Sequence, residues 1–397
     1  MGKTIAINAG SSTLKFKLFE MPQERVIASG AVERIGFETS PINIRYGLDH
    51  EYQETEAVPN HLAAVNIILD ELIKLHIIEH YDEITGVGHR VVAGGEIFHD
   101  SVLITDQVLT EIEQLAEYAP LHNPANVVGI RALKKVLPNV PAVAVFDTAF
   151  HTSMAPVNYL YSLPYDYYKK YGARKFGAHG TSHRYVAGRA AKLLGRPLDD
   201  LKLITLHLGA GSSITAIQNG KSVDTSMGFT PLAGITMATR AGDVDASLVA
   251  FLMKKLDIHD PDEMLKILNT QSGLLGIAGS ADMKELEDRY DDDEQARLAI
   301  DIFVNRIVKY VGAYMAEMQG ADALVITAGI GERDARMRQR IADKLGYFGV
   351  QIDPRRNQVS GVERDLSTPD AKVRVVLIPT NEELMIARDV ERVGRKS

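Results

Sequence analysis

Residues 7–13 read Ile-Asn-Ala-Gly-Ser-Ser-Thr, and the pattern returns at residues 206–213 as Leu-His-Leu-Gly-Ala-Gly-Ser-Ser. Each stretch lies between two β-like runs, KTIAIN and TLKFKLF around the first copy, LKLITLHL and SITAIQ around the second. This arrangement predicts a strand, a glycine turn and a returning strand in both places. Such a turn can direct backbone N–H groups at an anion, because glycine tolerates positive φ and small side chains let a phosphate approach. One copy alone is typical of an ordinary hairpin. Two copies predict a duplicated domain that binds a nucleotide from both sides.

The composition is that of a globular protein of two domains. The chain has 397 residues, of which 45% are hydrophobic and 24% charged, so each half can bury its own core. No apolar run approaches the roughly 20 residues of a membrane span, and the chain starts without a secretory signal, so we expect a cytoplasmic protein without a membrane partner. The net charge of −8 argues against a nucleic-acid partner. The lack of cysteine excludes disulfides, thiolate metal sites and cysteine nucleophiles.

The first part of the chain predicts a sheet with a charged residue at its edge. Strand-like runs at residues 26–32 and 42–46 extend the first hairpin, and apolar residues at helical spacing predict a helix over residues 61–80. A strand over residues 84–92 follows and carries Arg90 near its end. An arginine there is typical of a solvated strand edge, but the glycines that come next also fit the mouth of an α/β site.

Two polar residues precede and follow the next predicted strand. A helix over residues 106–118 leads to PLHNPAN at residues 120–126, where the prolines place His122 in a loop, either capping a helix or touching a ligand. The strand over residues 142–146 ends at Asp147. An acid directly after an apolar strand is typical of a catalytic or metal-positioning carboxylate, with helix N-capping as the alternative.

The middle of the chain contains a tyrosine-rich segment and a histidine at a helix start. Residues 159–171 show no clear period, and we interpret them as a loop-rich interface segment. The sequence GAHGTSH at residues 177–183 then opens a helix over residues 182–194. Because helix N-termini attract phosphate, we interpret His179 as a site residue.

The second hairpin is followed by turn-rich segments and scaffold helices. Residues 227–234 and 239–243 are turn-rich, and the latter carry Arg240. The helices predicted over residues 247–256, 261–269 and 293–319 look like scaffold. A strand predicted over residues 323–327 leads into the sequence AGIGER, a strand–glycine–helix pattern that is typical of nucleotide binding but is a weak signal by itself. A strand predicted over residues 372–378 leads into PTNEE at the start of the last helix. The two acids there also fit a simple role, in which they complement the helix dipole.

Taken together, ten stretches in this order resemble the acetate kinase family over nearly the whole chain. They are NAGSSTLK (8–15), GHRVVAGG (88–95), LHNPAN (121–126), FDTAFH (146–151), HGTSHRYV (179–186), HLGAGSS (207–213), DTSMGFTPLAG (224–234), TRAGD (239–243), GIGER (329–333) and PTNEE (379–383). The resemblance implies an α/β fold of two duplicated ribonuclease-H-like (actin-like ATPase) domains, with mixed sheets flanked by helices and an interdomain active-site cleft. It implies an acceptor and metal-side domain over residues 1–149 with helix 382–397 packing back on it, a nucleotide-binding, dimer-forming domain over residues 150–381, and a homodimer.

The resemblance also implies a reaction and a set of roles. The reaction is reversible Mg²⁺-dependent transfer of the ATP γ-phosphate to acetate, with Mn²⁺ as an alternative metal and ADP and acetyl phosphate as products. Asn8 and Glu383 become metal-associated residues, Arg90 and Arg240 hold acetate and the transferring phosphate, and His179 and Arg240 stabilise the transition state. Asp147 becomes the catalytic carboxylate, His122 a further site residue, and Val92, Leu121 and Pro231 the apolar wall. Lys15 would approach the phosphates, and the nucleotide would be lined by His207, Leu208, Gly209, Ala210, Gly211, Asp282, Met283, Lys284, Gly329, Ile330, Gly331, Glu332 and Arg333.

Elementary chemistry agrees with these roles. A carboxylate acceptor is ionised at neutral pH and needs no general base, unlike a sugar hydroxyl. It does need its charge neutralised, because an anion must approach a polyanionic phosphate in line. An arginine guanidinium can donate two parallel hydrogen bonds to the oxygens of a carboxylate or a phosphate. We therefore expect Asp147 to orient groups or to associate with the metal rather than to accept a proton.

The sequence departs from the family pattern at four places, which leave alternatives open. The family commonly has Phe at Ala178, Asn at Ala210, Arg at Lys284 and Gly at Ala328. Ala178 predicts a wider acyl pocket, and Ala210 and Lys284 leave the base preference open. The alternative functions are a propionate or butyrate kinase, an actin-like ATPase module and a sugar kinase.

Overall fold

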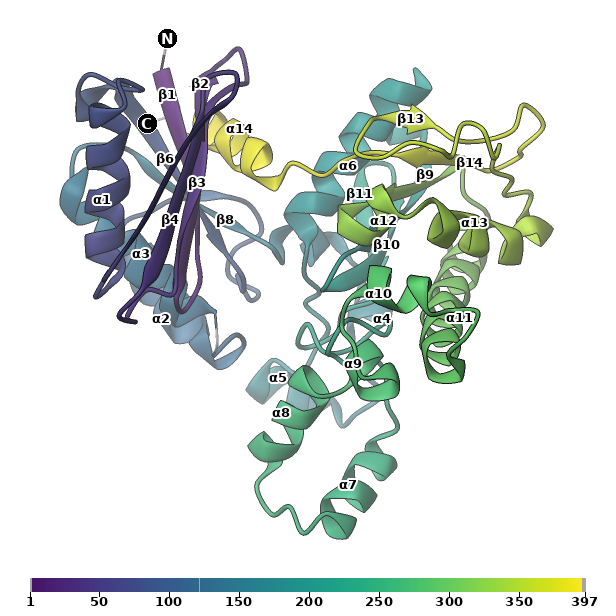
Figure 1. Ribbon diagram of the computed structural model, residues 1–397. Coiled ribbons are helices and arrows are strands. Elements are labelled where there is room, and N and C mark those ends of the chain that lie inside the picture. The colour runs from purple at the N-terminus through teal and green to yellow at the C-terminus, as the bar shows by residue number, and fades with distance from the viewer. Residues whose placement is uncertain (1, 121, 395–397) are drawn as a thin grey trace. The chain divides into compact units, whose positions relative to one another are not determined.

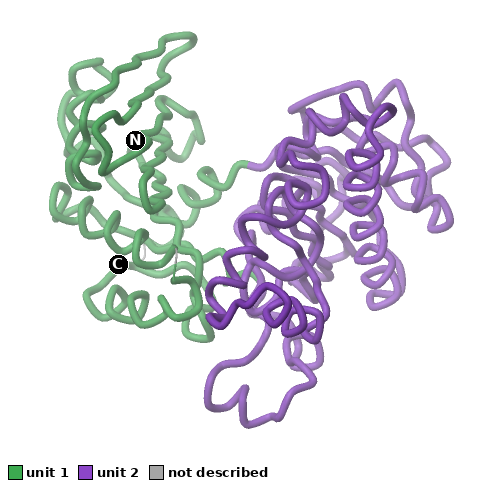
Figure 2. The backbone as a smooth tube through the Cα atoms, turned by 60° about the horizontal axis from the view of Figure 1, so that its bottom comes forward, with its two compact units in different colours: residues 1–150, 381–397 green, residues 151–380 purple. Residues whose placement is uncertain are grey.

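The computed structural model describes residues 2–120 and 122–394, and the chain divides into two compact units (Figure 2). Unit 1 comprises residues 1–150 and 381–397, and unit 2 comprises residues 151–380. Each unit has its own sheet, its own hydrophobic core and helices packed on its sheet.

Unit 1 is built on an eight-stranded mixed sheet (Figure 1). Its order is β5-β4-β3-β2-β1-β6-β8-β7, with β1, β6 and β8 parallel to one another and the other neighbours antiparallel. The strands are β1 (Gly2–Ala9), β2 (Thr13–Met21), β3 (Arg25–Glu33), β4 (Ser40–Tyr46), β5 (His50–Glu56), β6 (Ile84–Val91), β7 (Val102–Leu103) and β8 (Ala142–Phe146).

Unit 2 repeats this plan in a six-stranded sheet of order β11-β10-β9-β12-β14-β13. Its strands are β9 (Lys202–Leu208), β10 (Ser212–Gln218), β11 (Lys221–Thr225), β12 (Ala323–Thr327), β13 (Arg364–Asp365) and β14 (Arg374–Leu377). The first three strands of each unit form an antiparallel meander, and two parallel strands are added on the side of the first. The prediction of two duplicated α/β halves with mixed sheets is therefore confirmed.

Both glycine turns form the predicted hairpins. The β1–β2 turn is closed by a hydrogen bond from the Gly10 N–H to the Thr13 carbonyl oxygen (2.8 Å), and the β9–β10 turn by one from the Gly209 N–H to Ser212 Oγ (3.2 Å). In each hairpin the two strands pair antiparallel along their whole length. The repeated sequence pattern thus marks the same structural position in the two units.

Helices cover both faces of the unit 1 sheet. On one face, α14 (Glu382–Gly394) packs on β6, where a Cβ at Gly86 or Gly88 would lie only 2.4 or 2.3 Å from side-chain atoms of α14. Glycine at these positions lets the helix approach the sheet closely. On the other face lie α1 (His61–Lys74) and α3 (Asn123–Val136), with α2 (Asp106–Gln114) beside α3.

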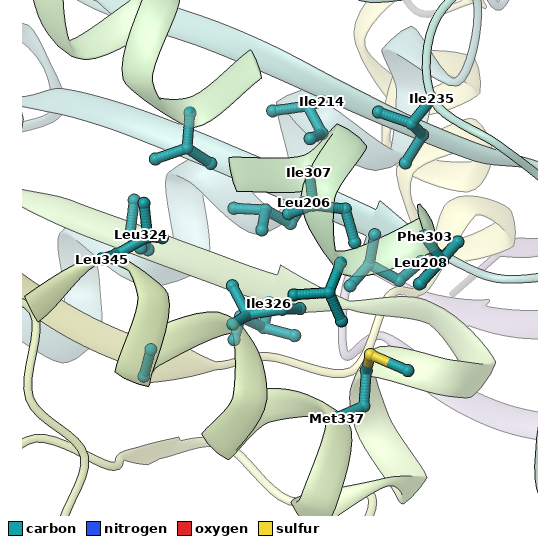
Figure 3. Packing of buried hydrophobic residues seen from close by; sticks show 14 of the residues in the cluster. Leu206, Leu208, Ile214, Ile235, Phe303, Ile307, Leu324, Ile326, Met337 and Leu345 are labelled. Carbon is teal, nitrogen blue, oxygen red and sulfur yellow. The ribbon is translucent and has the colours of Figure 1, made fainter. Parts of the chain in front are cut away.

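The core of unit 2 lies between its sheet and the long helix α11 (Glu294–Glu317) (Figure 3). Phe303 and Ile307 on α11 pack with Leu206, Leu324 and other strand residues, and all four are at most 1% exposed. Burying one such side chain contributes about 1.5–3 kcal/mol. The remaining helices of unit 2 are α4 (Pro156–Tyr159), α5 (Tyr165–Tyr171), α6 (Gly180–Leu194), α7 (Ala246–Lys255), α8 (Pro261–Thr270), α9 (Gly273–Ala278), α10 (Met283–Asp288), α12 (Ala328–Arg333) and α13 (Ala335–Lys344).

Three segments differ from the sequence expectations. Helix α1 ends at Lys74 rather than near residue 80, because the backbone turns at His76, whose φ is 53°. The tyrosine-rich segment is not a loop throughout: Pro164 precedes α5, and Gly172 ends it with a φ of 61°. Strand β5 could not be predicted from the sequence, because its residues, HEYQETE, do not alternate between apolar and polar. Six of its seven residues are exposed. None of the helices in the described ranges is long and apolar enough to cross a membrane.

Candidate active site

Three predicted site residues of unit 1 meet where its parallel strands end. Asn8 is next to last in β1, Arg90 is next to last in β6, and Asp147 directly follows β8. Because β1, β6 and β8 are adjacent and parallel, their carboxyl ends lie side by side. Arg90 donates to Asp147 Oδ2 from Nε (3.1 Å) and Nη2 (2.5 Å), and to Asn8 Oδ1 from Nη1 (3.3 Å).

The Arg90–Asp147 pair is largely removed from water. The Asp147 side chain is 1% exposed and that of Arg90 is 22% exposed. Burial opposes the charge on Arg90, but the negative charges of Asp147 and Glu382 outweigh it and raise the pKa of the guanidinium. Arg90 contacts only one carboxylate oxygen of Asp147, and the other, Oδ1, is buried without a hydrogen-bond partner among the described residues. A buried carboxylate oxygen of this kind is suited to a ligand.

The oxygen donors near Asp147 fit a magnesium ion. Glu382 and Glu383 begin α14, and Glu383 Oε2 accepts from Lys17 Nζ at 3.2 Å. Burial and then the charge of Asp147 raise the pKa of Glu382 to about 7, although Arg90 opposes the shift. In the described residues no three His, Asp or Glu side chains form a ready-made metal cage. Mg²⁺ usually keeps several waters and is held by one or two carboxylates, so this donor set, with the orphaned Asp147 oxygen, is compatible with it.

Two buried asparagines hold the backbone segment that follows Arg90. Asn126 Oδ1 accepts from the Val92 N–H (3.2 Å), and its Nδ2 donates to the Ala9 carbonyl oxygen (2.8 Å). Asn123 Oδ1 accepts from the Ala93 N–H, and its Nδ2 donates to the Ala93 carbonyl oxygen, both at 3.0 Å. Asn126 thus ties the end of β1 to the segment after β6, and Asn123 holds Ala93 within that segment. Sequence reasoning singled out His122 in this motif and missed its asparagines.

The other predicted residues of unit 1 range from buried to exposed. His122 is exposed at the start of α3, and its side chain does not cap that helix. Val92 is buried with Ala93 and Ala119. Leu121 lies outside the described residues. Lys15 is exposed on β2 and lines, with Lys17 and Arg45, a groove of about 840 Å³ over β2 to β5.

In unit 2, the start of α6 brings histidines together. His179 precedes α6 with a left-handed backbone (φ 57°), a conformation that costs a non-glycine residue about 1 kcal/mol or more and is concentrated at functional sites. Its ring stacks on His207 with 4.2 Å between centroids, and its Nδ1 is 2.9 Å from Ser213 Oγ. His207 Nδ1 is 2.8 Å from Ser182 Oγ.

His183 lies beneath these residues and was missed in the sequence. It is fully buried, with Nε2 at 2.8 Å from Ser213 Oγ and Nδ1 at 2.6 Å from Thr205 Oγ1. Burial, and then the positive charge that His151 or His207 would carry, lower its pKa well below the ordinary value. The signal was available, because residues four apart at a helix start, such as His179 and His183, lie on one face.

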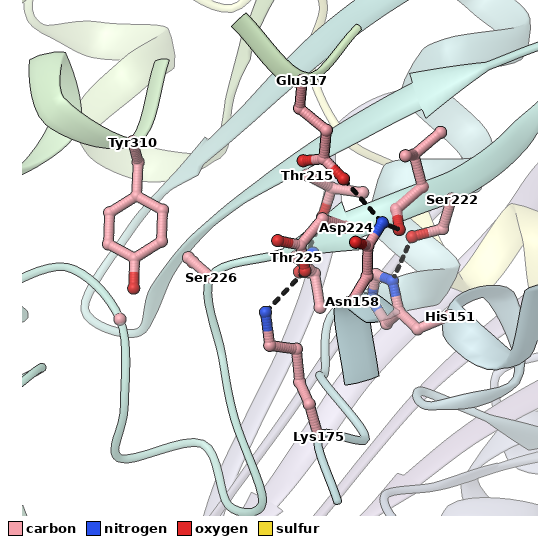
Figure 4. A network of polar contacts seen from close by, with 12 residues as sticks. His151, Asn158, Lys175, Thr215, Ser222, Asp224, Thr225, Ser226, Tyr310 and Glu317 are labelled. Carbon is pink, nitrogen blue, oxygen red and sulfur yellow. Dashed lines mark hydrogen bonds and ion pairs between the residues drawn. The ribbon is translucent and has the colours of Figure 1, made fainter. Parts of the chain in front are cut away.

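The histidine of the FDTAFH motif belongs to a structural network (Figure 4). His151 donates from Nε2 to the Ala178 carbonyl oxygen (2.9 Å), and its Nδ1 is 2.9 Å from Ser222 Oγ. Burial lowers the pKa of His151 to about 4. Nearby, Lys175 Nζ donates to Asp224 Oδ1 at 2.5 Å.

Ala178 is buried among methionine side chains of unit 2. It is 4% exposed and packs against Met227 and Met237. The two methionines occupy the space around its small side chain. A wider acyl pocket at this position stays a prediction.

Arg240 faces His179 across the second glycine turn. A Cβ built at Gly211 would lie 3.5 Å from His179 Nε2 and 3.6 Å from Arg240 Nη1. Arg240 Nη1 also donates to the Pro231 carbonyl oxygen at 3.2 Å. Burial lowers the pKa of Arg240. The structure thus brings His179 and Arg240 together at the second glycine turn, with His179 Nε2 and Arg240 Nη1 both close to Gly211.

The second turn also meets the GIGER segment. A Cβ at Gly209 would lie 3.6 Å from Ala328 Cβ and 4.0 Å from the Gly329 nitrogen. Glu332 Oε1 accepts from the N–H groups of Ala328 (2.8 Å) and Thr380 (3.0 Å), so its carboxylate fixes the segment. Beneath it, the buried Arg338, also missed in the sequence, donates to the Gly331 carbonyl oxygen at 2.8 Å. Gly329 and Arg333 are exposed, and Ile330 is half-buried.

The remaining residues that were predicted to line the nucleotide differ in their exposure. Asp282 caps α10 by accepting from the Lys284 N–H at 2.8 Å, and the Met283 side chain is buried in the unit 2 core. Lys284 and Ala210 are exposed, whereas Leu208 is buried in the core. A ligand at these positions would meet backbone groups rather than the side chains of Met283 and Leu208.

The whole chain is similar to known proteins. The sequence profile of the Acetokinase family matches residues 3–388. A protein of Lactiplantibacillus plantarum named acetate kinase is 85% identical over 395 residues, which cover 100% of both chains.

Solved structures give the same picture. The crystal structure of Porphyromonas gingivalis acetate kinase matches with a TM-score of 0.95 at 42% identity, covering 99% of this chain and 100% of that one. The crystal structure of a propionate kinase from Francisella tularensis matches with a TM-score of 0.93 at 39% identity and the same coverage.

Proposed function

Because the chain belongs to the acetokinase family, we propose that it catalyses the reversible transfer of the γ-phosphoryl group of ATP to acetate. A carboxylate oxygen of acetate forms the new bond to phosphorus, and the bond from the γ-phosphorus to the β,γ-bridging oxygen breaks. The products are acetyl phosphate and ADP. The protein is an enzyme, a phosphotransferase with a carboxyl group as acceptor.

The choice of a carboxylate as the acceptor of the phosphoryl group rests on the hydrogen bonds from Arg90 to Asp147. Arg90 reaches Asp147 Oδ2 through two nitrogens, the closer at 2.5 Å. Because both guanidinium nitrogens donate to Oδ2, Asp147 holds Arg90 in place, and the arginine can in turn orient an anion. A sugar hydroxyl would need a general base at this position, whereas acetate, already ionised, needs none. The pair therefore supports a carboxylate acceptor.

The cationic and donor groups have complementary roles in this proposal. Arg90 and Arg240 hold the acetate carboxylate and the transferring phosphoryl group, which lowers the repulsion between two anions that react in line. His179 and Arg240 donate to the equatorial oxygens of the phosphoryl group, whose charge must be stabilised in the transition state. Asp147 orients Arg90, and Val92, Leu121 and Pro231 border the methyl group. His122 is a further residue of the acceptor side.

Asn8 and Glu383 would hold Mg²⁺, with Mn²⁺ as an alternative, and Asp147 Oδ1 lies in the same group of oxygen donors. When bound, the metal neutralises phosphate charge and orients the phosphates. Lys15 approaches the phosphates. Residues 207–211, 282–284 and 329–333 line the nucleotide in this proposal, and the exposed backbone at Gly329 leaves room for close approach.

The assay that tests this function traps the product. The purified chain is incubated with MgATP and with acetate, propionate, butyrate or glucose, and acyl phosphate is captured with hydroxylamine as the hydroxamate. Hydroxamate formed fastest from acetate supports the proposal. Equal rates with propionate identify a broader short-chain acid kinase, and release of ADP without any acid identifies an ATPase module. Glucose 6-phosphate formation would identify a sugar kinase.

We also propose that the chain forms a homodimer through α7. None of the residues of α7 is buried, although the helix carries Leu248 and Phe251, which are 47% and 53% exposed. Leu256, which follows the helix, is 56% exposed. A second copy of the chain offers the same apolar face, so a two-fold contact would cover both copies at once.

A further inference from the structure

Two of the segments that line the nucleotide in the proposed function belong to short helices of unit 2. Residues 282–284 form the N-cap and first turn of α10. Residues 329–333 lie in α12, and a single residue, Asp334, joins α12 to α13. The position of α13 is therefore coupled to that of α12, so the placement of α10 against α13 affects the space between the two segments.

An ion pair joins α10 to α13. Arg340 Nη2, on α13, donates to Glu287 Oε2, on α10, at 3.1 Å. Arg336 Nε, one turn earlier on α13, lies 3.9 Å from the same oxygen, and Arg336 Nη2 lies 3.7 Å from Asp288 Oδ1. The side chain of Glu287 is 2% exposed and that of Arg340 is 25% exposed. Water screens such a pair less than it screens an exposed one.

Both partners of this pair are held in place by further contacts. Glu287 follows Met283 by four residues on α10, so the two lie on one face of the helix, and Met283 is buried in the core of unit 2. The Arg340 guanidinium lies over the ring of Tyr290, with its Cζ 3.6 Å from the ring centroid. Tyr290 Oη in turn donates to Asp301 Oδ1 of α11 at 3.0 Å. The cation–π contact and this hydrogen bond limit the orientations that Arg340 can adopt.

Stability alone does not explain a charge at Glu287. Burial and then the charge of Asp334 raise the pKa of Glu287, whereas Arg340 and Arg336 oppose the shift. The second carboxylate oxygen, Oε1, is buried without a hydrogen-bond partner among the described residues. Replacing a buried ion pair by apolar residues of similar volume is often neutral or stabilising. A buried pair can instead specify one relative position of the elements that it joins.

We propose that Glu287 and Arg340 fix α10 against α13 and thereby set the affinity for the nucleotide. The inference rests on the proposed function, in which ATP and ADP lie against residues 282–284 and 329–333. Both are positioning residues, since they act through these two segments. Loss of the pair lets α10 move relative to α13 and weakens nucleotide binding, while the acceptor residues of unit 1 keep their own contacts.

The first test measures nucleotide binding without turnover. Isothermal titration calorimetry gives the dissociation constant of MgADP for the natural chain, for Glu287→Gln and for Arg340→Met. We expect this constant to rise about 3- to 10-fold in each variant, the value of one net hydrogen bond. The double variant should bind about as weakly as the weaker single variant, because the two residues act as one unit.

The outcomes of this titration separate the two proposals. If the natural chain binds MgADP and both folded variants bind it equally tightly, the inference about Glu287 and Arg340 is wrong and the proposed function stands. If the natural chain binds no MgADP, the proposed function is wrong, and this inference falls with it.

The second test distinguishes positioning from a loss of folded enzyme. In the hydroxamate assay the KM for MgATP should rise by the same about 3- to 10-fold, while kcat and the KM for acetate stay within about 2-fold of the natural values. A merely structural role would lower kcat and leave the KM for MgATP unchanged, and that result would overturn the proposal. Should either variant fail to fold by circular dichroism, Arg340→Lys takes its place. It keeps the charge without the planar contact to Tyr290, and its KM for MgATP should rise by about 2-fold or more.

Asp322→Asn is the matched control. Asp322 Oδ1 accepts from Arg196 Nη1 at 2.6 Å, so this substitution also removes an arginine–carboxylate pair from unit 2. Asp322 directly precedes β12, whereas the 329–333 segment follows the other end of that strand. The dissociation constant of MgADP and the KM for MgATP should stay at their natural values. An equal rise in Asp322→Asn would contradict a specific role for Glu287 and Arg340.

Discussion

Gly273 lies directly against the backbone of Arg240. A Cβ at Gly273 would be 2.7 Å from the Arg240 carbonyl oxygen and 2.2 Å from that of Met237, and its φ is +62°. The N–H groups of Leu274 and Leu275 donate to the carbonyl oxygens of Met237 (3.0 Å) and Ala238 (2.9 Å). The start of α9 therefore fixes the loop that carries Arg240.

Gly273→Ala should move Arg240 and reduce turnover. The new methyl group would collide with backbone atoms, which cannot rotate away, so the loop must shift. A misplacement of about 1 Å at a positioning group can cost about 100-fold in rate. We expect kcat of hydroxamate formation to fall by about 10- to 100-fold while the chain still folds, as judged by circular dichroism.

Gly279→Ala is the control for Gly273→Ala. Gly279 ends α9 with a φ of +72°, but a Cβ there would meet no atom within 4 Å. Both substitutions carry the strain of a left-handed backbone, about 1 kcal/mol each. Only Gly273→Ala should lose activity. Equal kcat values for the two variants would contradict the positioning role of Gly273.

Ala328→Gly should stabilise unit 2. Ala328 has a φ of 66°, in the left-handed region, although it begins α12 in the candidate nucleotide segment. Glycine adopts this conformation without the steric cost, so we expect the free energy of unfolding to rise by about 1 kcal/mol. Chemical denaturation measures it. Ala313→Gly, at an exposed site of α11, should instead lower the stability by about 1 kcal/mol.

The sequence was sufficient for features that depend on local pattern. The repeated glycine turns predicted two similar units because a strand–turn–strand hairpin has the same sequence pattern in both halves of the chain. Arg90 and Asp147 could both be interpreted as site candidates because each lies at the end of an apolar strand, and parallel strands end at one edge.

Features that depend on distant contacts could not be found in this way. Asn126 binds Ala9, 117 residues away, and Ser213 contacts His183 of α6 and His179, which precedes that helix. Neither contact follows from the periodicity of its own segment. The exposure of α7 was equally hidden, because an apolar helix that packs on a core and one that faces outward have the same pattern.

Buried histidines should make the protein less stable in acid. Burial lowers the pKa of His89 to about 3, against about 6.5 for an unfolded histidine. Between these values the unfolded chain binds more protons than the folded chain, so the free energy of unfolding falls as the pH falls below about 6.5. At pH 5 the loss from His89 alone is about 2 kcal/mol.

His89→Leu tests this contribution. His89 is 2% exposed and its Nε2 has no hydrogen-bond partner in the described part of the chain, so an apolar side chain of similar size should be tolerated. The stability difference between pH 7.5 and pH 5, measured in urea, should shrink by about 2 kcal/mol. His259→Leu, at a side chain that is 88% exposed, should leave the difference unchanged. An unaltered pH dependence in His89→Leu would falsify the assignment.

Asp147→Asn should keep the fold and lose most turnover. The amide cannot neutralise Arg90, which would then be free to bind other anions in the wrong place. We expect kcat to fall by about 100-fold or more, as for other preorganised charged groups. Asp365→Asn removes a comparable partner, since Asp365 accepts from Arg374 Nε at 3.1 Å, but at the edge of the unit 2 sheet. It should retain activity, and full activity of Asp147→Asn would contradict the proposed role.

Phe251→Asp should convert the dimer into a monomer. The ring is 53% exposed on a helix that buries none of its residues, so in the proposed dimer it is covered by the second copy. A carboxylate buried there without a partner would cost several kcal/mol, enough to shift the dissociation constant by more than about 100-fold. Light scattering after gel filtration would show the monomer mass at micromolar concentration. Tyr347→Asp replaces an aromatic residue that is 96% exposed after α13 and should leave the mass of the natural chain unchanged. A dimer that persists in Phe251→Asp would place the interface on another surface.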